Sequence, residues 1–435
     1  MDNPQITRIT QIQQTTFLSG FCPNSFANVP RNLWITLHCL PMNDSIEQAY
    51  AALFQWCSSR DFAGYDPFDA LNSRLFQSTP LIHSRTARLI WTQAFKRFPL
   101  NLRPLALVPP QKNSKGLALF ALAALANYRR TKTPEAETTA RELLAQLSSK
   151  RIDGYSGAAW GYNFPWQSRN FFAERETPMI VPTAFAARAF VEGYQAFADQ
   201  NYLQTARSVC DFITKDLKRA VESAEEICFS YSPLDATQIF NASLLAGETL
   251  AGVGDATGEG DFCDLAARAA CYVARRQRED GAWSYGTGPR QQWVDNFHTA
   301  YVLLALSRIS KGCVGACVEA DAALERGFKY WRESFFLADG WPKYYHDSLY
   351  PADAHAAATA VVTLLELQEL DCDALPLAQR IAAWAIRNLR DRRGFFYYQR
   401  WRFFTIRTPY MRWTQAWMLY ALARLLEAEG CNANC

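Results

Sequence analysis

Two kinds of apolar pattern alternate along the chain from residue 81 onward. One kind is amphipathic, with apolar residues at helical spacing on one face, as at 134–149 and 376–392. The other is apolar nearly all round, as at 116–128 and 356–367. A helix without a polar face must be enclosed by protein, whereas an amphipathic helix lies between a core and water. The pattern therefore predicts an all-α chain built from inner and outer helices.

The alternation is periodic. A hydroxyl residue marks the first turn of each of six predicted inner helices, and these residues are Ser114, Thr183, Thr237, Thr299, Thr359 and Thr414. Their separations of 69, 54, 62, 60 and 55 residues indicate a repeat of nearly fixed length. An amphipathic helix precedes each inner one, which predicts twelve helices, and a further helix near 44–58 precedes the array.

The connections between the helices are of two lengths. Each inner helix is joined to the next outer helix by a short link, whereas the outer-to-inner connections are long, at 98–113, 151–179, 218–235, 279–294, 335–352 and 391–408. This order predicts a six-hairpin α/α toroid whose inner helices run parallel, with all six long loops at their N-terminal ends. We expect residues 81–430 to form the toroid and residues 1–80 to form an N-terminal extension that packs on it.

Composition supports this picture and narrows the function. Of 435 residues, 49% are hydrophobic and 20% are charged, so the chain has a core, and a net charge of +3 gives no basis for nucleic-acid binding. The first residues do not resemble a secretory signal, and no apolar run approaches the roughly 20 residues of a membrane helix. Twelve scattered cysteines without a CxxC pair predict buried thiols in a reducing compartment, hence a cytoplasmic location.

Aromatic and basic side chains are concentrated in the long loops, at the predicted mouth of the barrel. Aromatic faces suit the apolar faces of sugars, and Arg or Lys beside them suits a carboxylate such as that of a uronic acid. For any single aromatic, packing of its loop is the alternative role. The candidate substrate-binding residues are Arg103, Lys112, Asn113, Trp160, Tyr162, Trp166, Trp283, Tyr285, Trp293, Trp341, Tyr344, Tyr345, Arg407, Tyr410, Arg412 and Trp413.

Five residues at the starts of inner helices are candidates for catalysis. Asp235, Asp295 and Asp353 each precede an inner helix, where helix capping is the alternative role. His298 and His355 open adjacent inner helices and can act as proton carriers or as structural residues. Asp295 precedes His298 by three residues, about one helical turn, and can orient its ring.

No metal or cofactor is expected. No cysteine lies near these candidates, and the chain has no compact zinc-ligand motif, Gly-rich phosphate loop, GxSxG or HExxH.

Residues 268–283 resemble the QW repeat of terpene cyclases, with matches at Arg268, Ala269, Tyr272, Val273, Gln277, Gly281 and Trp283. A degraded copy at 326–341 keeps Arg326, Gly327, Tyr330, Gly340 and Trp341. The resemblance implies the toroid of the terpenoid cyclases and protein prenyltransferases, in which the repeat is structural.

The chemistry of those families is not implied. The nearest segment to the acid motif DxDD is "DCDA" at 371–374, in a short turn at the wrong end of the barrel, and DDxxD is absent. Asp295 and His355 resemble two of the zinc ligands of protein prenyltransferases, but Phe297 stands where the cysteine ligand belongs.

A second resemblance runs through "DGAWSYG" and "WVDNFHTAYVLLAL". These segments are similar to toroidal proteins of bacterial exopolysaccharide biosynthesis and to the helical domain of uronyl 5-epimerases. The likeness covers residues 60–427 in general plan and is specific over 277–306.

Three function classes follow. The first is a cytoplasmic carbohydrate-active protein of polysaccharide or glycoconjugate metabolism, which acts on a sugar chain or uronic-acid substrate by acid/base chemistry at the toroid mouth. Hydrolysis, epimerisation and elimination all remain open within it. The second is a terpenoid or prenyl-diphosphate cyclase or transferase. The third is a toroid without catalytic activity that binds a glycan or a protein.

Overall fold

The computed structural model describes residues 42–168, 171–313 and 317–433; expectations for residues 1–41 lie outside this part of the chain. Within it, six helices contact one another in a closed ring in which the last returns to the first. These inner helices are α4 (Ser114–Thr131), α6 (Ile180–Phe197), α8 (Phe240–Thr257), α10 (Asn296–Gly312), α12 (Ala354–Glu366) and α14 (Trp417–Ala433). The domain boundary expected at residue 80 stays a prediction.

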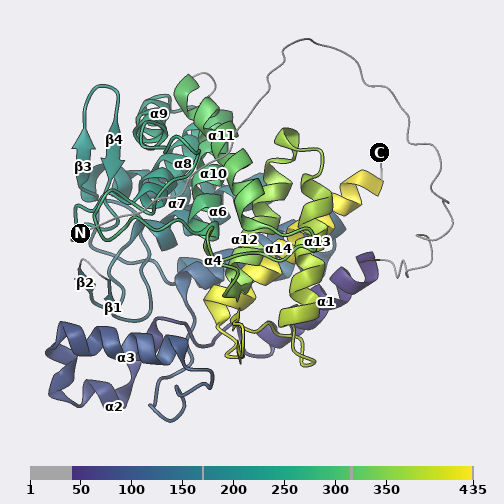
Figure 1. Ribbon diagram of the computed structural model, residues 1–435. Helices are drawn as coiled ribbons and strands as arrows, with labels where there is room; N and C mark the ends of the chain where they lie inside the picture. The colour runs from purple at the N-terminus through teal and green to yellow at the C-terminus, as the bar shows by residue number, and fades with distance from the viewer. Residues whose placement is uncertain (1–41, 169–170, 314–316, 434–435) are drawn as a thin grey trace, which may run out of the picture. The chain divides into compact units, whose positions relative to one another are not determined.

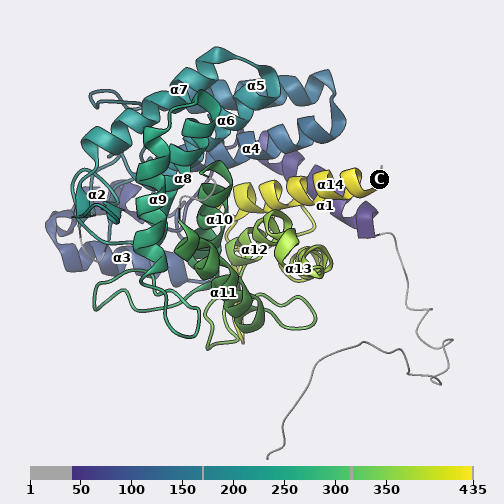
Figure 2. The ribbon, with the colours of Figure 1, turned by 90° about the horizontal axis from the view of Figure 1, so that it is seen from above.

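A second set of six helices packs outside this ring, each against one or two inner helices. They are α1 (Met42–Ser58), α5 (Pro134–Ser148), α7 (Gln200–Asp211), α9 (Asp261–Ala274), α11 (Val318–Phe335) and α13 (Ala374–Leu389). Figures 1 and 2 show α1 alongside α14, which closes the outer set. The predicted all-α toroid of six inner and six outer helices is confirmed.

The first outer helix is not the one that the sequence pattern indicated. The helix after residue 81 is α3 (Arg85–Arg97), and its main contacts are with η1 (Asp69–Asn72), η2 (Pro80–His83) and β1 (Trp166–Gln167). The place beside α13 and α14 is taken by α1, the helix expected to precede the array. Both α1 and α3 are amphipathic. Their patterns therefore did not show that α1 packs on the ring of inner helices and α3 packs on loop segments.

Capping side chains set the start of three inner helices. Asn113, Asp295 and Asp353 precede α4, α10 and α12, and each accepts a hydrogen bond from a backbone N–H of the first turn. Two predicted markers lie before the helices they were assigned to: Thr237 is in the loop before α8, and Thr414 is in the π-helical turn Met411–Ala416 that leads into α14. Downstream of the caps the inner helices are buried nearly all round, as their apolar pattern predicts.

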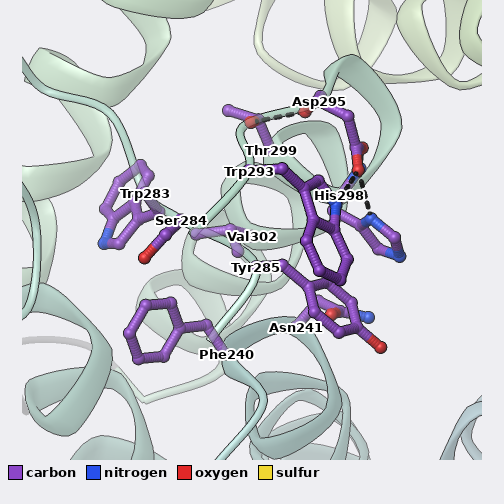
Figure 3. Close-up of a pocket in the computed structure, with 10 residues that line it drawn as sticks. All are labelled: Phe240, Asn241, Trp283, Ser284, Tyr285, Trp293, Asp295, His298, Thr299 and Val302. Carbon is purple, nitrogen blue, oxygen red and sulfur yellow. Dashed lines mark hydrogen bonds and ion pairs between the residues drawn. The ribbon is translucent and has the colours of Figure 1, made fainter. Parts of the chain in front are cut away.

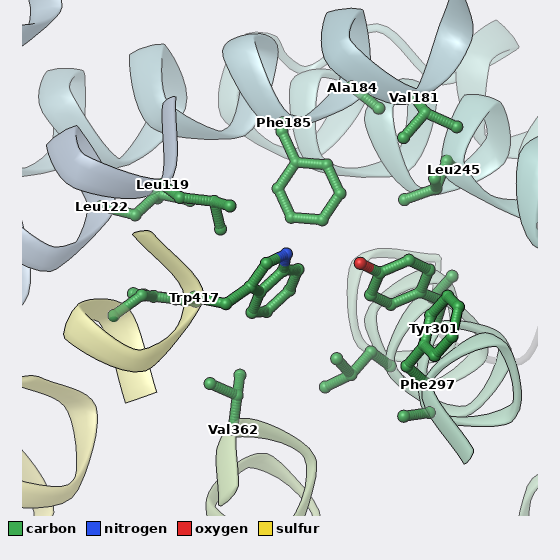
Figure 4. Close-up of a cluster of buried hydrophobic side chains, with 14 of the residues drawn as sticks. Leu119, Leu122, Val181, Ala184, Phe185, Leu245, Phe297, Tyr301, Val362 and Trp417 are labelled. Carbon is green, nitrogen blue, oxygen red and sulfur yellow. The ribbon is translucent and has the colours of Figure 1, made fainter. Parts of the chain in front are cut away.

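Packed side chains fill the axis of the ring. Side chains from all six inner helices point inward, and those labelled in Figure 4 include Leu119, Phe185, Leu245, Tyr301, Val362 and Trp417. The Tyr301 and Trp417 rings stack at 5.6 Å between centroids, and Phe185 meets Trp417 edge-on at 5.5 Å. The ring therefore encloses a solid core rather than a channel.

Short antiparallel strands lie in the long connections. The pairs are β1 with β2 (Phe172–Ala173), β3 (Arg219–Glu222) with β4 (Ile227–Phe229), and β5 (Ala352–Asp353) with β6 (Gln399–Arg400), which also pairs with β7 (Thr405–Ile406).

The QW-like segment has a packing role. The Gln277 amide donates to the carbonyls of Gly281 and Ala323, at 2.9 and 2.8 Å, and the Trp283 indole donates to that of Val273 at 2.9 Å. These bonds tie the loop after α9 to α11.

Two disulfides correct the expectation for the cysteines. Cys263 is bonded to Cys313, and Cys271 is bonded to Cys317. Both bonds join α9 to a neighbouring helix end: Cys313 follows α10, and Cys317 precedes α11. The prediction of unpaired thiols is therefore wrong for these four residues, because the spacing between repeats brings cysteines from neighbouring hairpins together. In the described ranges, no helix has the length and apolar character needed to cross a membrane.

Candidate active site

A cavity of about 710 Å³ opens at the N-terminal ends of the inner helices. The long loops form its walls, as predicted. Nine of the predicted residues line it: Asp295, His298, Tyr162, Trp166, Tyr285, Trp293, Tyr344, Tyr345 and Trp413, and Arg412 makes a tenth. We call this space the mouth cavity.

The mouth cavity contains a paired carboxylate and imidazole. Asp295 Oδ2 lies 2.7 Å from Nδ1 of His298 and accepts a hydrogen bond of 2.9 Å from the Trp293 indole. Figure 3 shows both rings directed at the carboxylate. Because Asp295 is an acceptor when ionised, Nδ1 carries the hydrogen in neutral His298, and Nε2 has a free lone pair.

Helix capping and ring orientation are combined in Asp295. Its Oδ1 accepts from the backbone N–H of His298, at 2.9 Å, and its Oδ2 holds the side chain of the same residue. The two roles that the sequence left open are thus both present. Asp295 is 3% exposed, so protein groups rather than water satisfy its carboxylate.

A second, water-sized space of about 10 Å³ lies behind this pair (Figure 3). Asn241 lines it and is buried, and its Oδ1 has no hydrogen-bond partner within the described residues. The space is just large enough for one water molecule, which Asn241 would bind.

Aromatic rings form one wall of the mouth cavity. Tyr285 and Trp293 stack with centroids 4.6 Å apart, and Tyr285 also contacts the His298 ring at 4.5 Å. Trp166, which also lines the cavity, contacts Tyr231 at 5.3 Å and Phe171 at 5.6 Å. These faces suit the apolar side of a sugar ring, and the hydroxyl and indole groups suit its edge.

Three cationic side chains line the same space. Arg412 is fixed by a bidentate ion pair with Asp66, with N–O distances of 2.6 and 2.7 Å. Lys96 and Arg97 reach the cavity from α3. Burial lowers the pKa of Lys96 to about 8, and its Nζ lies 4.4 Å above the Phe68 ring. Lys96 is therefore a cation that loses its charge close to neutral pH.

The other candidate acids and bases do not line the mouth cavity. Asp235 caps a turn, where Ser232 and Thr237 each donate to it through their backbone N–H and hydroxyl groups. Asp353 is fully buried, and Gln399 donates to it at 2.7 Å. Its burial raises its pKa to about 6. Both carboxylates serve the fold in these positions.

His355 belongs to a buried chain of three polar side chains below the cavity. Its Nε2 lies 2.7 Å from the Tyr301 hydroxyl, which also accepts a hydrogen bond of 3.2 Å from Lys115 Nζ. Burial lowers the pKa of both His355 and Lys115 well below their ordinary values. Lys115 lies over the rings of the axial core, 4.4 Å from the centroid of Phe185. Phe297 and Trp413 separate this chain from the mouth cavity.

Several predicted binding residues are held by other parts of the fold. Arg103 is fully buried, and its guanidinium binds Asp69, Tyr410 and the Asp66 carbonyl. Because it is fully buried among these partners, it does not reach a ligand in the mouth cavity. Lys112 pairs with Asp61 at 2.5 Å.

The remaining members of the predicted set also lie outside the lining of the mouth cavity. Asn113 caps α4, and Arg407 is exposed beside Tyr397. The indoles of Trp160, Trp283 and Trp341 each donate to a backbone carbonyl.

Helix α3 supplies four lining residues that were not among the predicted ones. Leu89, Gln93, Lys96 and Arg97 all come from it. Their spacing follows one helical face, but that face was assigned to contact with the barrel. The two basic residues on this face, Lys96 and Arg97, were the available signal.

A second large cavity, of about 610 Å³, opens at the C-terminal ends of the inner helices. Its charged side chains neutralise one another: Arg308 binds Glu248 and Glu366, each at 2.7 Å, and Arg129 binds Glu427 at 2.5 Å. The axial core separates it from the mouth cavity. In the described part of the chain, no group of three His, Cys, Asp or Glu is placed to hold a metal.

No protein-family model and no curated protein matches the chain. Solved structures do match over most of its length. Cellobiose 2-epimerase from Bacillus thermoamylovorans is 15% identical with a TM-score of 0.58, covering 74% of this chain and 88% of that one. The fold is that of an α/α toroid.

Two further α/α toroids are similar to this one. A family 76 α-mannanase from Bacteroides thetaiotaomicron is 11% identical with a TM-score of 0.57, covering 74% of this toroid and 87% of its own chain. An unsaturated glucuronyl hydrolase specific for heparin is 13% identical with a TM-score of 0.55, covering 89% and 97%. At these identities the likeness establishes the fold.

Proposed function

We propose that this toroid is a carbohydrate-active enzyme that transfers a proton at a sugar carbon, as in epimerisation, isomerisation or elimination. The observation that carries the proposal is the Asp295–His298 pair in a cavity walled by aromatic rings. The solved structures that share the fold include a sugar epimerase and two glycosidases, which supports a carbohydrate substrate.

The lining of the mouth cavity favours proton transfer at carbon over hydrolysis. Glycoside hydrolysis uses two carboxylates across the scissile bond, roughly 5–10 Å apart. Among the described residues that line the cavity, Asp295 is the one carboxylate. Its Oδ2 is already hydrogen-bonded to His298 and Trp293. A His–Asp pair instead supplies one base with an oriented lone pair.

The residues then have distinct roles. His298 Nε2 takes the proton from a carbon next to a carbonyl or carboxylate, and Asp295 stabilises the imidazolium that forms. Lys96 and Arg97 offset the negative charge that develops on the oxygen. The carbon is inverted when the planar enolate turns its other face to His298 before the imidazolium returns the proton, whereas departure of a group from the neighbouring carbon completes an elimination.

The cationic lining indicates a substrate with an anionic group, such as a uronic acid. Thermal-shift measurements with uronic acids, neutral disaccharides and prenyl diphosphates test this choice. We expect uronic acids to raise the melting temperature more than neutral sugars do, because they add a charge-assisted contact. Stabilisation by prenyl diphosphates alone would overturn the proposal.

The cytoplasmic location expected from the sequence is kept as a proposal. The two disulfides count against it, because reducing compartments keep thiols unpaired. Alkylation of the protein in unbroken cells decides the point: in the cytoplasm Cys263 and Cys313 should react, and in an oxidising compartment they should not.

A further inference from the structure

Helix α3 has a third face that nothing in the described structure covers. One face lines the mouth cavity through Gln93 and Lys96, and a second packs Phe95 against Ala70. The third carries Ile90, Ala94 and Phe98, four residues apart, and all three are exposed. Apolar residues at this spacing form a continuous stripe along a helix.

The stripe belongs to a longer segment with many exposed apolar side chains, residues 73–112, which we call the arm. Figure 1 shows its helices α2 (Arg74–Gln77) and α3 close to β1 and β2. Of the sixteen large hydrophobic side chains exposed in the described residues, seven lie here: Leu75, Leu81, Ile90, Phe98, Leu100, Leu105 and Leu107. Single exposed apolar residues are ordinary, but such a concentration marks an interaction site.

The charge of the arm has one sign. Residues 73–112 contain seven Lys or Arg and no Asp or Glu, although the whole chain has 45 basic and 42 acidic residues. Two of the seven are neutralised within the fold, Arg103 by Asp69 and Lys112 by Asp61. Arg74 and Arg97 are exposed in the same segment as the apolar side chains, and Arg97 also reaches the mouth cavity.

We propose that the arm docks on a lipid bilayer surface that carries anionic headgroups. Exposed leucine, isoleucine and phenylalanine side chains enter the boundary between headgroups and acyl chains, and the surrounding arginines bind the headgroups. A protein partner or a second copy of the chain would need acidic groups to match the arm, and the arm itself offers none. Docking requires no spanning helix and agrees with the lack of one in the described residues.

Docking of the arm would also position the mouth cavity, because α3 lines the cavity and is part of the arm. Docking would hold the cavity close to the headgroups, where a saccharide attached to a lipid is presented. The inference concerns the surface alone and stands whether or not the proposed proton transfer is correct.

Co-sedimentation of the full chain with vesicles tests the proposal. One set of vesicles is phosphatidylcholine alone, and the other mixes phosphatidylserine and phosphatidylcholine in equal parts. We expect binding to the mixed vesicles and at least roughly tenfold weaker binding to phosphatidylcholine. The variant Ile90→Ser/Leu100→Ser/Leu105→Ser should weaken binding to the mixed vesicles by roughly tenfold or more. These three side chains are 65%, 67% and 77% exposed, so folding should be unaffected.

The control replaces exposed apolar residues elsewhere, as Val318→Ser/Leu370→Ser, and should bind as the wild type does. Arg74→Glu alone should also weaken binding to the mixed vesicles. If the triple variant melts at a lower temperature than the wild type, Arg74→Glu is the variant that tests the proposal. Equal binding to both kinds of vesicle, no binding to either, or full binding by the arm variants overturns the proposal. Loss of self-association in the triple variant, with no vesicle binding by the wild type, would assign the surface to a second copy instead.

Discussion

Nδ1 of His298 and Oδ2 of Asp295 lie 2.7 Å apart within the first turn of α10, and the same carboxylate caps that helix. The cap fixes the position of Asp295, and Asp295 in turn fixes the ring of His298. The free nitrogen of the imidazole is therefore oriented by secondary structure rather than by a mobile loop.

Replacing Asp295 with Asn separates the two functions of this carboxylate. Asn caps helices nearly as well as Asp, so we expect the melting temperature to change little. The amide lacks the charge that stabilises imidazolium, and we expect kcat to fall roughly 100- to 10,000-fold. Asp235→Asn is the matched control, because Asp235 also caps a turn but does not line the mouth cavity. Equal losses in both variants would contradict the role given to Asp295.

The charge of Lys96 predicts how the affinity for anionic ligands depends on pH. Burial lowers its pKa to about 8, so Lys96 is charged below this pH and neutral above it. Affinity for a uronic acid should be highest below pH 8, where Lys96 is charged, and should fall as the pH rises above the pKa of Lys96. In Lys96→Met the affinity should be roughly tenfold weaker and independent of pH in this range. Calorimetric titration of the two proteins from pH 6 to about 9.5 provides the measurement. An identical pH profile in the variant would rule out Lys96 as the ligand's cationic partner.

The buried pair of Asp66 and Arg412 should show strong coupling. Both side chains are about 95% buried and bind each other through two hydrogen bonds. Asp66→Ala leaves an uncompensated buried cation, and we expect a loss of roughly 3–5 kcal/mol in the free energy of unfolding. Arg412→Met added to it should recover part of the loss, because no charge is then left unpaired. Urea denaturation of the two single variants and the double variant measures the coupling, and simple additivity would contradict it.

Reduction of the two disulfides should lower stability without loss of the fold. Each closes a loop, with sequence separations of 50 and 46 residues, and constrains the unfolded chain by about 4 kcal/mol in the entropic model. The loops overlap, so the combined effect should be smaller than the sum. Thermal unfolding with and without dithiothreitol checks this, with Cys263→Ser/Cys313→Ser as the variant that should resemble partial reduction. Identical melting curves would show that the bonds do not form in solution.

The periodic alternation of apolar and amphipathic helices was enough to predict the toroid and the location of its mouth. The Asp295–His298 pair was also predictable, because a three-residue separation across a helix start places the two side chains together. Arg103 and Tyr410 were misassigned for a physical reason. Arg103 binds both Tyr410 and Asp69, and Asp69 lies in a segment without helical periodicity, so no local pattern could show that the three would be buried together.

The contribution of α3 was hidden for a related reason. An amphipathic pattern identifies a helix with one buried face, but it does not say which surface buries that face. The pairing of cysteines between α9 and the next hairpin likewise depends on how neighbouring repeats align in space, which their scattered positions along the chain do not reveal.

Hydrogen exchange at a sugar carbon tests the central claim most directly. The protein is incubated in D2O with the uronic acid or disaccharide that stabilises it best, and proton NMR follows each carbon-bound hydrogen. If His298 removes a proton from carbon, the signal of one carbon next to the carbonyl or carboxylate should disappear with time, and it should persist with Asp295→Asn. New reducing ends that appear while every carbon keeps its hydrogen would contradict the account and assign the cavity to hydrolysis.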